Sequence, residues 1–104
     1  MKTVKYNKDD LVKKLSQKLL FSHDDMKFMV DNFLETILDI LKQPKDNIRI
    51  ELRNFGIFEV KPTKAKPKAR NPRTNEEIFV PAHRKISFKP GKSLKSELKK
   101  EWKV

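Results

Sequence analysis

The sequence has no cysteine, and this absence excludes disulfide bonds and thiolate metal sites. Its two histidines, His23 and His83, stand alone, without a second histidine or a cysteine at the spacing of metal ligands. Neither the first ten residues nor any later stretch has an apolar run long enough for a signal peptide or a membrane span. These absences predict no metal, no cofactor and no membrane anchor, and they are compatible with the reducing cytoplasm.

Acidic residues are also scarce, but only in the second part of the chain. The 104 residues are enough for one domain and carry a net charge of +11. Residues 1–60 hold eleven Lys and Arg against ten Asp and Glu, whereas residues 61–104 hold fourteen against four. A nearly neutral half joined to a strongly basic half indicates a polyanionic partner. Nucleic acid is the first candidate, and an anionic membrane surface is the second.

Residues 61–75, KPTKAKPKARNPRTN, contain no acid, no aromatic residue and three prolines. Such a segment has too little apolar surface to bury and too much charge to desolvate. The stretches on either side, 57–61 and 77–80, predict strands, and Asn-Pro-Arg-Thr-Asn is a turn signal. We predict a long basic hairpin with Pro72 at or near its tip, and a solvated loop is the alternative. Its basic residues are Lys61, Lys64, Lys66, Lys68, Arg70 and Arg73.

Two amphipathic helices are predicted in the neutral half. Asn7 is the expected N-cap of the first helix, which ends near Leu20, and Ser22 is the expected N-cap of the second, which ends near Lys42. Each helix has a pair of acids in its first turn, where the helix dipole favours anions. Because capping and the dipole explain these pairs without catalysis, we predict no enzyme. The pairs are Asp9 with Asp10 and Asp24 with Asp25.

The second helix has more apolar surface than one core requires. Its apolar residues cover roughly half of the circumference, whereas a helix packed on a single core needs a stripe about 100° wide. The residues outside the hairpin are too few to bury that much surface alone. We interpret the surplus as a dimer interface, and a single wide core is the alternative. Phe28 falls on the polar face, and the pattern does not explain it.

The second half of the chain predicts a sheet and a third helix. Residues 48–53 alternate strictly, residues 54–56 form a turn, and further strands follow at 57–61 and, after Pro81, at 85–89. Pro90 is the expected first residue of the last helix, whose narrow apolar stripe ends at Trp102. The predicted fold class is α+β, in one domain over residues 1–104. It has two N-terminal helices, a three-stranded antiparallel sheet with an extended β-hairpin arm at about 61–83, and a C-terminal helix.

Three motifs carry a family resemblance: RNFGIFEV, ARNPRTNEEI and FKPGKSLK. In this order, behind two helices, they resemble the HU/integration host factor family of bacterial histone-like DNA-bending proteins, from about Tyr6 to Trp102. The resemblance implies an intertwined dimer in the nucleoid, either homodimer or heterodimer. It also implies that the two arms enter the DNA minor groove, bending and compacting the DNA.

The family's DNA-binding residues carry over to matching positions of this chain. The resemblance implies that Pro72 intercalates between base pairs. Arg70, Asn71 and Arg73 lie beside it at the tip. The other expected DNA-binding residues are Lys61, Lys64, Lys66, Lys68, Arg84 and Lys85 in the arm and at its base, Arg53 at the sheet turn, Lys92 and Lys95 at the last helix, and Lys8 at the first.

Four positions depart from the family pattern. Ala69 stands where glycine is common, and Asn54 and Asn75 each replace a glycine. Pro67 stands where arginine is usual, which removes a phosphate contact and a strand donor. We therefore expect a stiffer arm with a weaker grip on DNA.

The sequence also bears on how specifically the protein binds and on which partner it binds. Residues 61–75 of the arm lack the glutamine and glutamate that usually read base edges, so we predict weak sequence preference, for deformable DNA. Site-specific bending, as by integration host factor, is the nearer alternative. RNA is a secondary candidate, because residues 61–75 hold no aromatic residue on which bases could stack. A membrane is not expected, because the apolar stripe of the last helix is thin.

Overall fold

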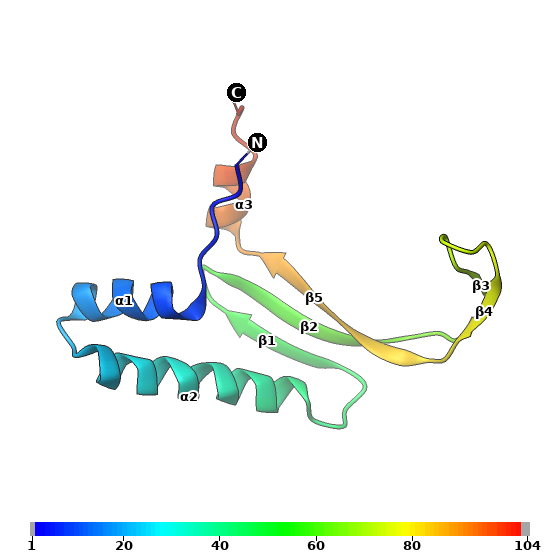
Figure 1. The fold of residues 1–104 in the computed structure, drawn as a ribbon, viewed down its shortest axis with the longest axis horizontal. Coiled ribbons are helices and arrows are strands. Elements are labelled where there is room, and N and C mark those ends of the chain that lie inside the picture. Colours follow the sequence, from blue (N-terminus) through cyan, green and yellow to red (C-terminus); the bar gives the residue numbers. More distant parts are fainter. Residues whose placement is uncertain (1, 103–104) are drawn as a thin grey trace. The chain divides into compact units, whose positions relative to one another are not determined.

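The computed structural model describes residues 2–102, which form two compact units, 2–43 and 44–102. The first unit contains α1 (Lys8–Leu19) and α2 (His23–Leu41). The second contains β1 (Ile48–Leu52), β2 (Gly56–Thr63), β3 (Lys66–Arg70), β4 (Glu77–Val80), β5 (His83–Pro90) and α3 (Lys92–Leu98) (Figure 1). The predicted α+β fold class and the order of its elements are confirmed.

Both N-terminal helices begin where their caps were predicted. The Asn7 side chain accepts a hydrogen bond from the Asp10 N–H at 2.9 Å, and the Asp10 carboxylate accepts one from the Asn7 N–H at 2.9 Å. This reciprocal pair is a capping box. Ser22 caps α2 by accepting a hydrogen bond from the Asp25 N–H at 3.1 Å. The carboxylate of Asp10 therefore completes the cap of α1, and the backbone of Asp25 completes the cap of α2.

α1 ends in a left-handed residue, Leu20, with φ 59° and ψ 36°. Its N–H donates to the Ser16 carbonyl, which closes the last turn. Glycine normally occupies this position, because it lacks the Cβ that a left-handed backbone crowds. Leu20 is 90% exposed, so its side chain gains no burial in return for that crowding.

The two helices of the first unit share a small core and two ionic links. Val12 of α1 and Met26 of α2 are buried. Lys8 Nζ lies 2.6 Å from Asp31, and His23 Nε2 lies 3.0 Å from Asp9. The sequence did not indicate the pairing of His23, which lies fourteen residues from Asp9. Much of the apolar surface of α2 stays exposed.

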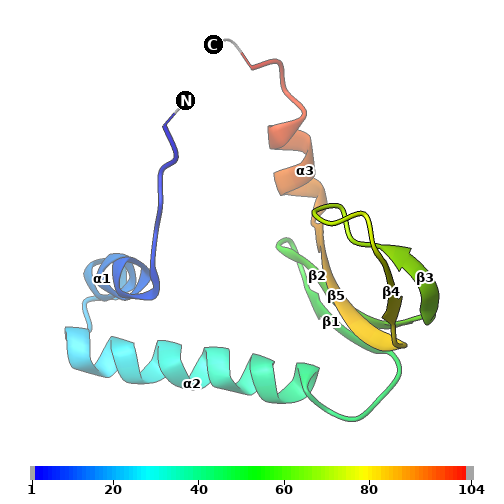
Figure 2. The ribbon, with the colours of Figure 1, turned by 45° about the vertical axis from the view of Figure 1, so that its right-hand side comes forward.

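The main sheet of the second unit is antiparallel, in the order β1-β2-β5 (Figure 2). Ile50 pairs with Phe58, which pairs with Phe88, so the apolar positions of the three strands fall on one face. The ring centroids of Phe58 and Phe88 are 5.0 Å apart, and those of Phe55 and Phe88 are 5.6 Å apart. These contacts and buried Val60 form the core of this unit.

β2 and β5 are longer than predicted, and each includes a proline, Pro62 and Pro90, that the prediction had left outside the strands. β1 pairs with β2 only up to Val60, so at Pro62 one edge of β2 is open. A missing N–H costs nothing at an open edge. Pro90 was expected to begin the last helix, but it ends the edge strand β5, opposite Gly56. The helix is capped by Gly91 instead and ends at Leu98, so Trp102 lies beyond it.

Candidate nucleic-acid interface

The segment 61–83, which we call the arm, is a twisted antiparallel hairpin that continues from β2 and β5 (Figures 1 and 2). β3 pairs with β4 in a separate two-stranded sheet. Arg70 lies opposite Glu77, and Lys66 lies opposite Val80. The prediction of a long basic hairpin is confirmed, because the segment forms strands on both sides of its turn.

The base of the arm is fixed by Thr63 and His83, the last pair of the β2–β5 ladder. The Thr63 hydroxyl lies 3.3 Å from the His83 N–H and 3.1 Å from its ring Nδ1. The same ring nitrogen lies 3.0 Å from the Pro81 carbonyl. His83 therefore links the returning strand to β2 at the point where the two sheets separate.

Pro67 lies in an irregular part of the arm. The register shifts between Lys66 and Ala69, so that Pro67 and Lys68 both lie opposite Phe79. A proline cannot donate to the ladder, and irregular pairing is where strands tolerate one. The predicted loss of a strand donor at Pro67 agrees with this shift.

The tip of the arm, residues 71–75, is a closed turn with Pro72 exposed on it. The Asn75 N–H donates to the Asn71 carbonyl at 2.7 Å, and the Asn71 N–H donates to the Glu76 carbonyl at 2.8 Å. The Asn71 side chain accepts a hydrogen bond from the Arg73 N–H at 2.9 Å, which bridges Pro72. The proline is thus presented by a turn whose backbone is already ordered.

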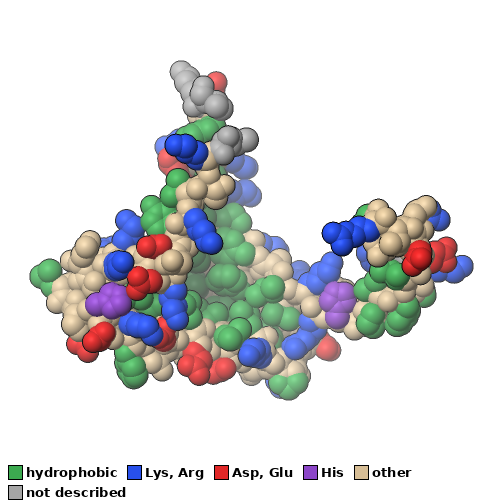
Figure 3. Space-filling model, in the orientation of Figure 1, with side chains coloured by type: hydrophobic (Ala, Val, Ile, Leu, Met, Phe, Trp, Pro, Cys, Tyr) green, Lys and Arg blue, Asp and Glu red, His purple; other side chains and the backbone are tan. Residues whose placement is uncertain are grey.

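The cations of the arm have few acidic partners. No ion pair between the described residues, 2–102, involves Lys64, Lys66, Lys68, Arg70 or Arg73. All five are exposed. Figure 3 shows basic side chains on the arm and at its base. Concentrated positive charge without internal compensation attracts a polyanion.

Lys61 at the arm's base differs, because a carboxylate lies near it. Lys61 Nζ is 3.7 Å from Glu59, and Lys89 Nζ is 2.8 Å from the same carboxylate. The hydrogen bond from Lys89 and the nearby positive charges hold the pKa of Glu59 below its usual value. Lys61 also lies opposite Lys85 in the ladder, and like charges in that position repel unless an anion lies between them.

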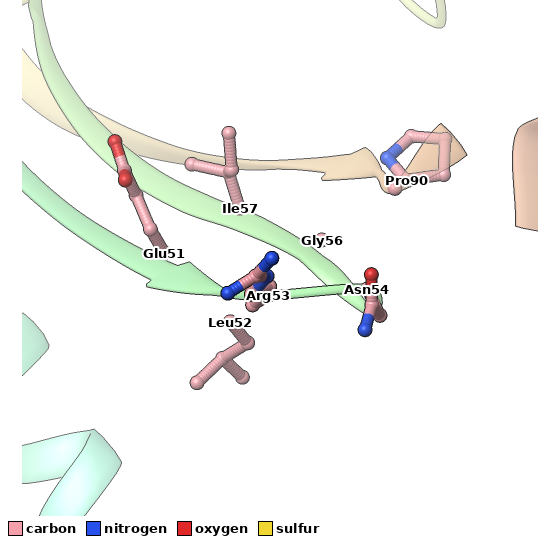
Figure 4. A pocket seen from close by; sticks show the side chains of 8 residues that line it. Glu51, Leu52, Arg53, Asn54, Gly56, Ile57 and Pro90 are labelled. Atoms are coloured by element: carbon pink, nitrogen blue, oxygen red, sulfur yellow. The ribbon is translucent and has the colours of Figure 1, made fainter. Parts of the chain in front are cut away.

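The turn between β1 and β2 places Arg53 beside the start of α3. Asn54 follows it with φ 68°, a left-handed conformation that asparagine tolerates. Leu52, Arg53, Asn54, Gly56, Pro90 and Gly91 line a cavity of about 370 Å³ (Figure 4). Lys92 and Lys95 stand in the first turns of α3, directly after this cavity lining. The structure therefore brings Arg53 and the α3 lysines to one end of the sheet.

Two predicted DNA-binding residues have protein partners. Lys8 pairs with Asp31, whose pKa is lowered by hydrogen bonds from Lys27 and Lys8. Arg84 donates to the Lys45 carbonyl at 2.9 Å, which ties the α2–β1 loop to β5. These contacts give both side chains a structural role within their own units.

One aromatic residue of the arm was not expected from the sequence. Residues 61–75 hold none, but Phe79 in β4 lies within the arm and is 65% exposed. Phe28, the residue without an explanation, is also exposed, at 70%. The alternation of β4 could have revealed Phe79, since it lies on the opposite face from Ile78 and Val80.

Over residues 2–102, no group of three or more His, Cys, Asp or Glu side chains could hold a metal ion. None of the described helices is long and apolar enough to cross a membrane.

The sequence and the fold of this chain are similar to those of known bacterial proteins. Residues 6–99 match the family described as bacterial DNA-binding protein. DNA-binding protein HU 1 of Bacillus subtilis is 43% identical over 89 residues, covering 86% of this chain and 92% of the relative. Integration host factor subunit alpha of Saccharophagus degradans is 38% identical over 91 residues, covering 88% and 86%. The solved structure described as an Anabaena HU-DNA cocrystal is 29% identical, with a TM-score of 0.77, and covers 92% of this chain and 100% of that one.

Proposed function

Because the chain belongs to the family of bacterial DNA-binding proteins that includes HU and integration host factor, we propose that it acts as a dimer whose two arms enter the minor groove of DNA. The chain is an HU-like architectural protein that binds and bends DNA, and it is not an enzyme. Its dimeric state, the roles of individual residues and its place in the nucleoid are parts of the proposal.

The observation that carries the proposal is the tip of the arm. Pro72 is exposed on a turn that its neighbours' hydrogen bonds hold closed. Its ring is a compact apolar wedge without an N–H that would lose its partner between unstacked bases. Unstacking one base step costs a few kcal/mol, which a bent duplex recovers by touching more basic surface. The uncompensated cations behind the tip supply that surface.

Replacing the proline at the tip tests this proposal. Pro72→Ala is expected to keep the fold and most of the salt-sensitive binding but to lose much of the bend, because alanine cannot wedge a base step. Energy transfer between dyes at the two ends of a short duplex measures the bend. Pro67→Ala is the matched control, a proline of the same arm away from the tip, and is expected to bend DNA like the parent. Full bending by Pro72→Ala would reduce Pro72 to a turn former.

The proposed dimer is supported by apolar side chains that the first unit leaves exposed. Phe33 is 58% exposed, Leu38 49% and Leu34 43%. A groove of about 480 Å³ is lined by Leu11, Lys14, Leu15, Lys18, Val30, Phe33 and Leu34 of α1 and α2. Exposed apolar surface of this extent marks a site of association. A second copy of the chain would cover it.

Sedimentation equilibrium tests the dimer. We expect a dimer at micromolar concentration and a thermal midpoint that rises with protein concentration, because subunit association stabilises the folded state. Phe33→Asp is expected to dissociate it by burying a charge in the interface. Arg53→Glu is the control and should weaken DNA binding without changing assembly. A parent chain that sediments as a folded monomer at all concentrations would contradict the dimer.

Low sequence specificity is the favoured form of the activity. The arm's tip and strands hold lysines and arginines, which bind phosphate in any sequence. Relatives named HU and relatives named integration host factor have similar identity to the chain, so site-specific bending stays the second candidate. Competition between random duplexes separates the two. A binding site enriched from a random pool by more than about a thousandfold over bulk DNA would favour the site-specific form.

A further inference from the structure

Two apolar side chains of the arm point to opposite faces of its sheet, and both are exposed. In β4, Ile78 is 43% exposed and Phe79 is 65% exposed. The sheet consists of β3 and β4 alone, so it has no second layer of its own to cover either face. An exposed phenylalanine in such a ribbon contributes little to folding. It is available for a ligand of the arm.

The surroundings of Phe79 indicate the chemistry of that ligand. Phe79 lies opposite Pro67 and Lys68, and by strand alternation it shares a face with Glu77 and, across the ladder, Arg70. Lys68 and Arg70 are among the arm cations without an ion pair between residues 2–102. A ring flanked by cations that have no ion pair suits a polyanion that carries apolar surface between its charges. The walls of a DNA groove have this character, since deoxyribose rings lie between successive phosphates.

We propose that Phe79 packs against the deoxyribose wall of the minor groove and adds a contribution to DNA affinity that does not depend on salt. This inference rests on the proposed function, because it takes the arm to lie in the groove. Phosphate contacts release counterions, and their contribution falls as salt rises. Apolar burial releases none, so its contribution multiplies the affinity by the same factor at each salt concentration. Phe79 and the arm's cations thus affect different features of one binding curve.

Phe79→Thr tests the contact, because threonine keeps the strand preference of the site and removes the ring. Duplex binding is measured by fluorescence anisotropy over a series of salt concentrations. We expect the dissociation constant to rise about a hundredfold at each concentration, about tenfold for each of the two phenyl rings that the proposed dimer loses, with an unchanged slope against log salt. Phe28→Ala, at an exposed phenylalanine of α2, is the matched control and is expected to leave the affinity unchanged. Circular dichroism verifies that each variant is folded.

Three results would overturn the contact. Phe79→Thr could bind duplex as tightly as the parent at each salt concentration. It could lose affinity through a shallower slope, which would assign the effect to charge. It could lose more affinity for single-stranded DNA or RNA than for duplex, which would show the ring stacking on bases rather than on sugars. Failure of the proposed function itself would appear in the parent, as duplex binding that does not respond to salt or as an absence of bending.

Discussion

The salt dependence of DNA binding follows from the number of unpaired cations on the arm. Lys64, Lys66, Lys68, Arg70 and Arg73 are exposed and have no ion pair within the described part of the chain. Two arms in a dimer present twice that number. If each cation neutralises one phosphate, about ten counterions are released, and log affinity should fall against log salt with a slope of about −9.

Removing one of these cations should change the slope by a known amount. Lys68→Ala removes two phosphate contacts from each dimer, so we expect a slope of about −7, with the same loss on all duplex sequences. Fluorescence anisotropy between about 50 and 200 mM salt covers the range in which such a slope is measurable. The variant should keep its thermal midpoint, because Lys68 is exposed and has no protein partner between residues 2 and 102.

Lys61→Ala is the matched control, a lysine of the same hairpin whose ammonium lies 3.7 Å from Glu59. Its charge is already partly neutralised, so its removal should change the slope by less than one unit per arm. The reasoning would be refuted by equal slopes for Lys68→Ala and the parent. It would also be refuted by a parent slope flatter than about −4, which would mean that most arm cations do not contact phosphate.

Three further predictions concern stability and are measured by denaturant unfolding at fixed protein concentration. Gly56→Ala should destabilise by about 2 kcal/mol, because its Cβ would lie 2.5 Å from the Phe88 ring and 2.6 Å from a backbone oxygen; an unchanged midpoint would contradict this packing. Leu20→Gly should stabilise by about 0.5–1 kcal/mol by relieving the left-handed cap, and a loss of stability would mean that the leucine is buried on assembly. The pKa of Glu59 is lowered in the folded state, so its stabilising effect is full above the ordinary value of 4.5 and is lost as pH falls through the folded pKa. The parent's advantage over Glu59→Gln should therefore disappear in acid, and a constant difference would refute the ion pair with Lys89.

The sequence predicted correctly those features that depend only on neighbouring residues, such as helix caps and the alternation of a strand. Asn7 and Ser22 were found from sequence because a capping residue needs only its own first turn. The alternation of β1 predicted which of its residues face the core. The approximate C-terminal ends of α1 and α2 followed from the same kind of pattern. The family resemblance then predicted which residues surround the tip.

The errors arose where pairing between distant segments decides the outcome. Pro90 has the composition of a helix start, but β5 is an edge strand and can accommodate it opposite Gly56. Lys8 stays a predicted DNA contact, and it also pairs with Asp31 on the next helix. Spacing along the chain did not reveal that link, because the two residues belong to different helices. The exposure of Phe79 follows from the absence of a second layer over β3 and β4, which the structure shows.

The tip of the arm shows how a departure from the family pattern serves the same geometry. Asn75, at a position where the family commonly has glycine, has φ 61°, a left-handed conformation that asparagine adopts more readily than most residues. Unlike glycine, it has a side chain, and its Oδ1 accepts a hydrogen bond from the Arg70 guanidinium at 3.1 Å. That bond joins the end of β3 to the turn and holds an unpaired cation beside Pro72. The proposed insertion of Pro72 into DNA would cost less conformational freedom with this charge already oriented, because ordering a side chain on binding costs affinity. The asparagine therefore supplies both the backbone bend that the turn requires and the orientation of the charge beside Pro72.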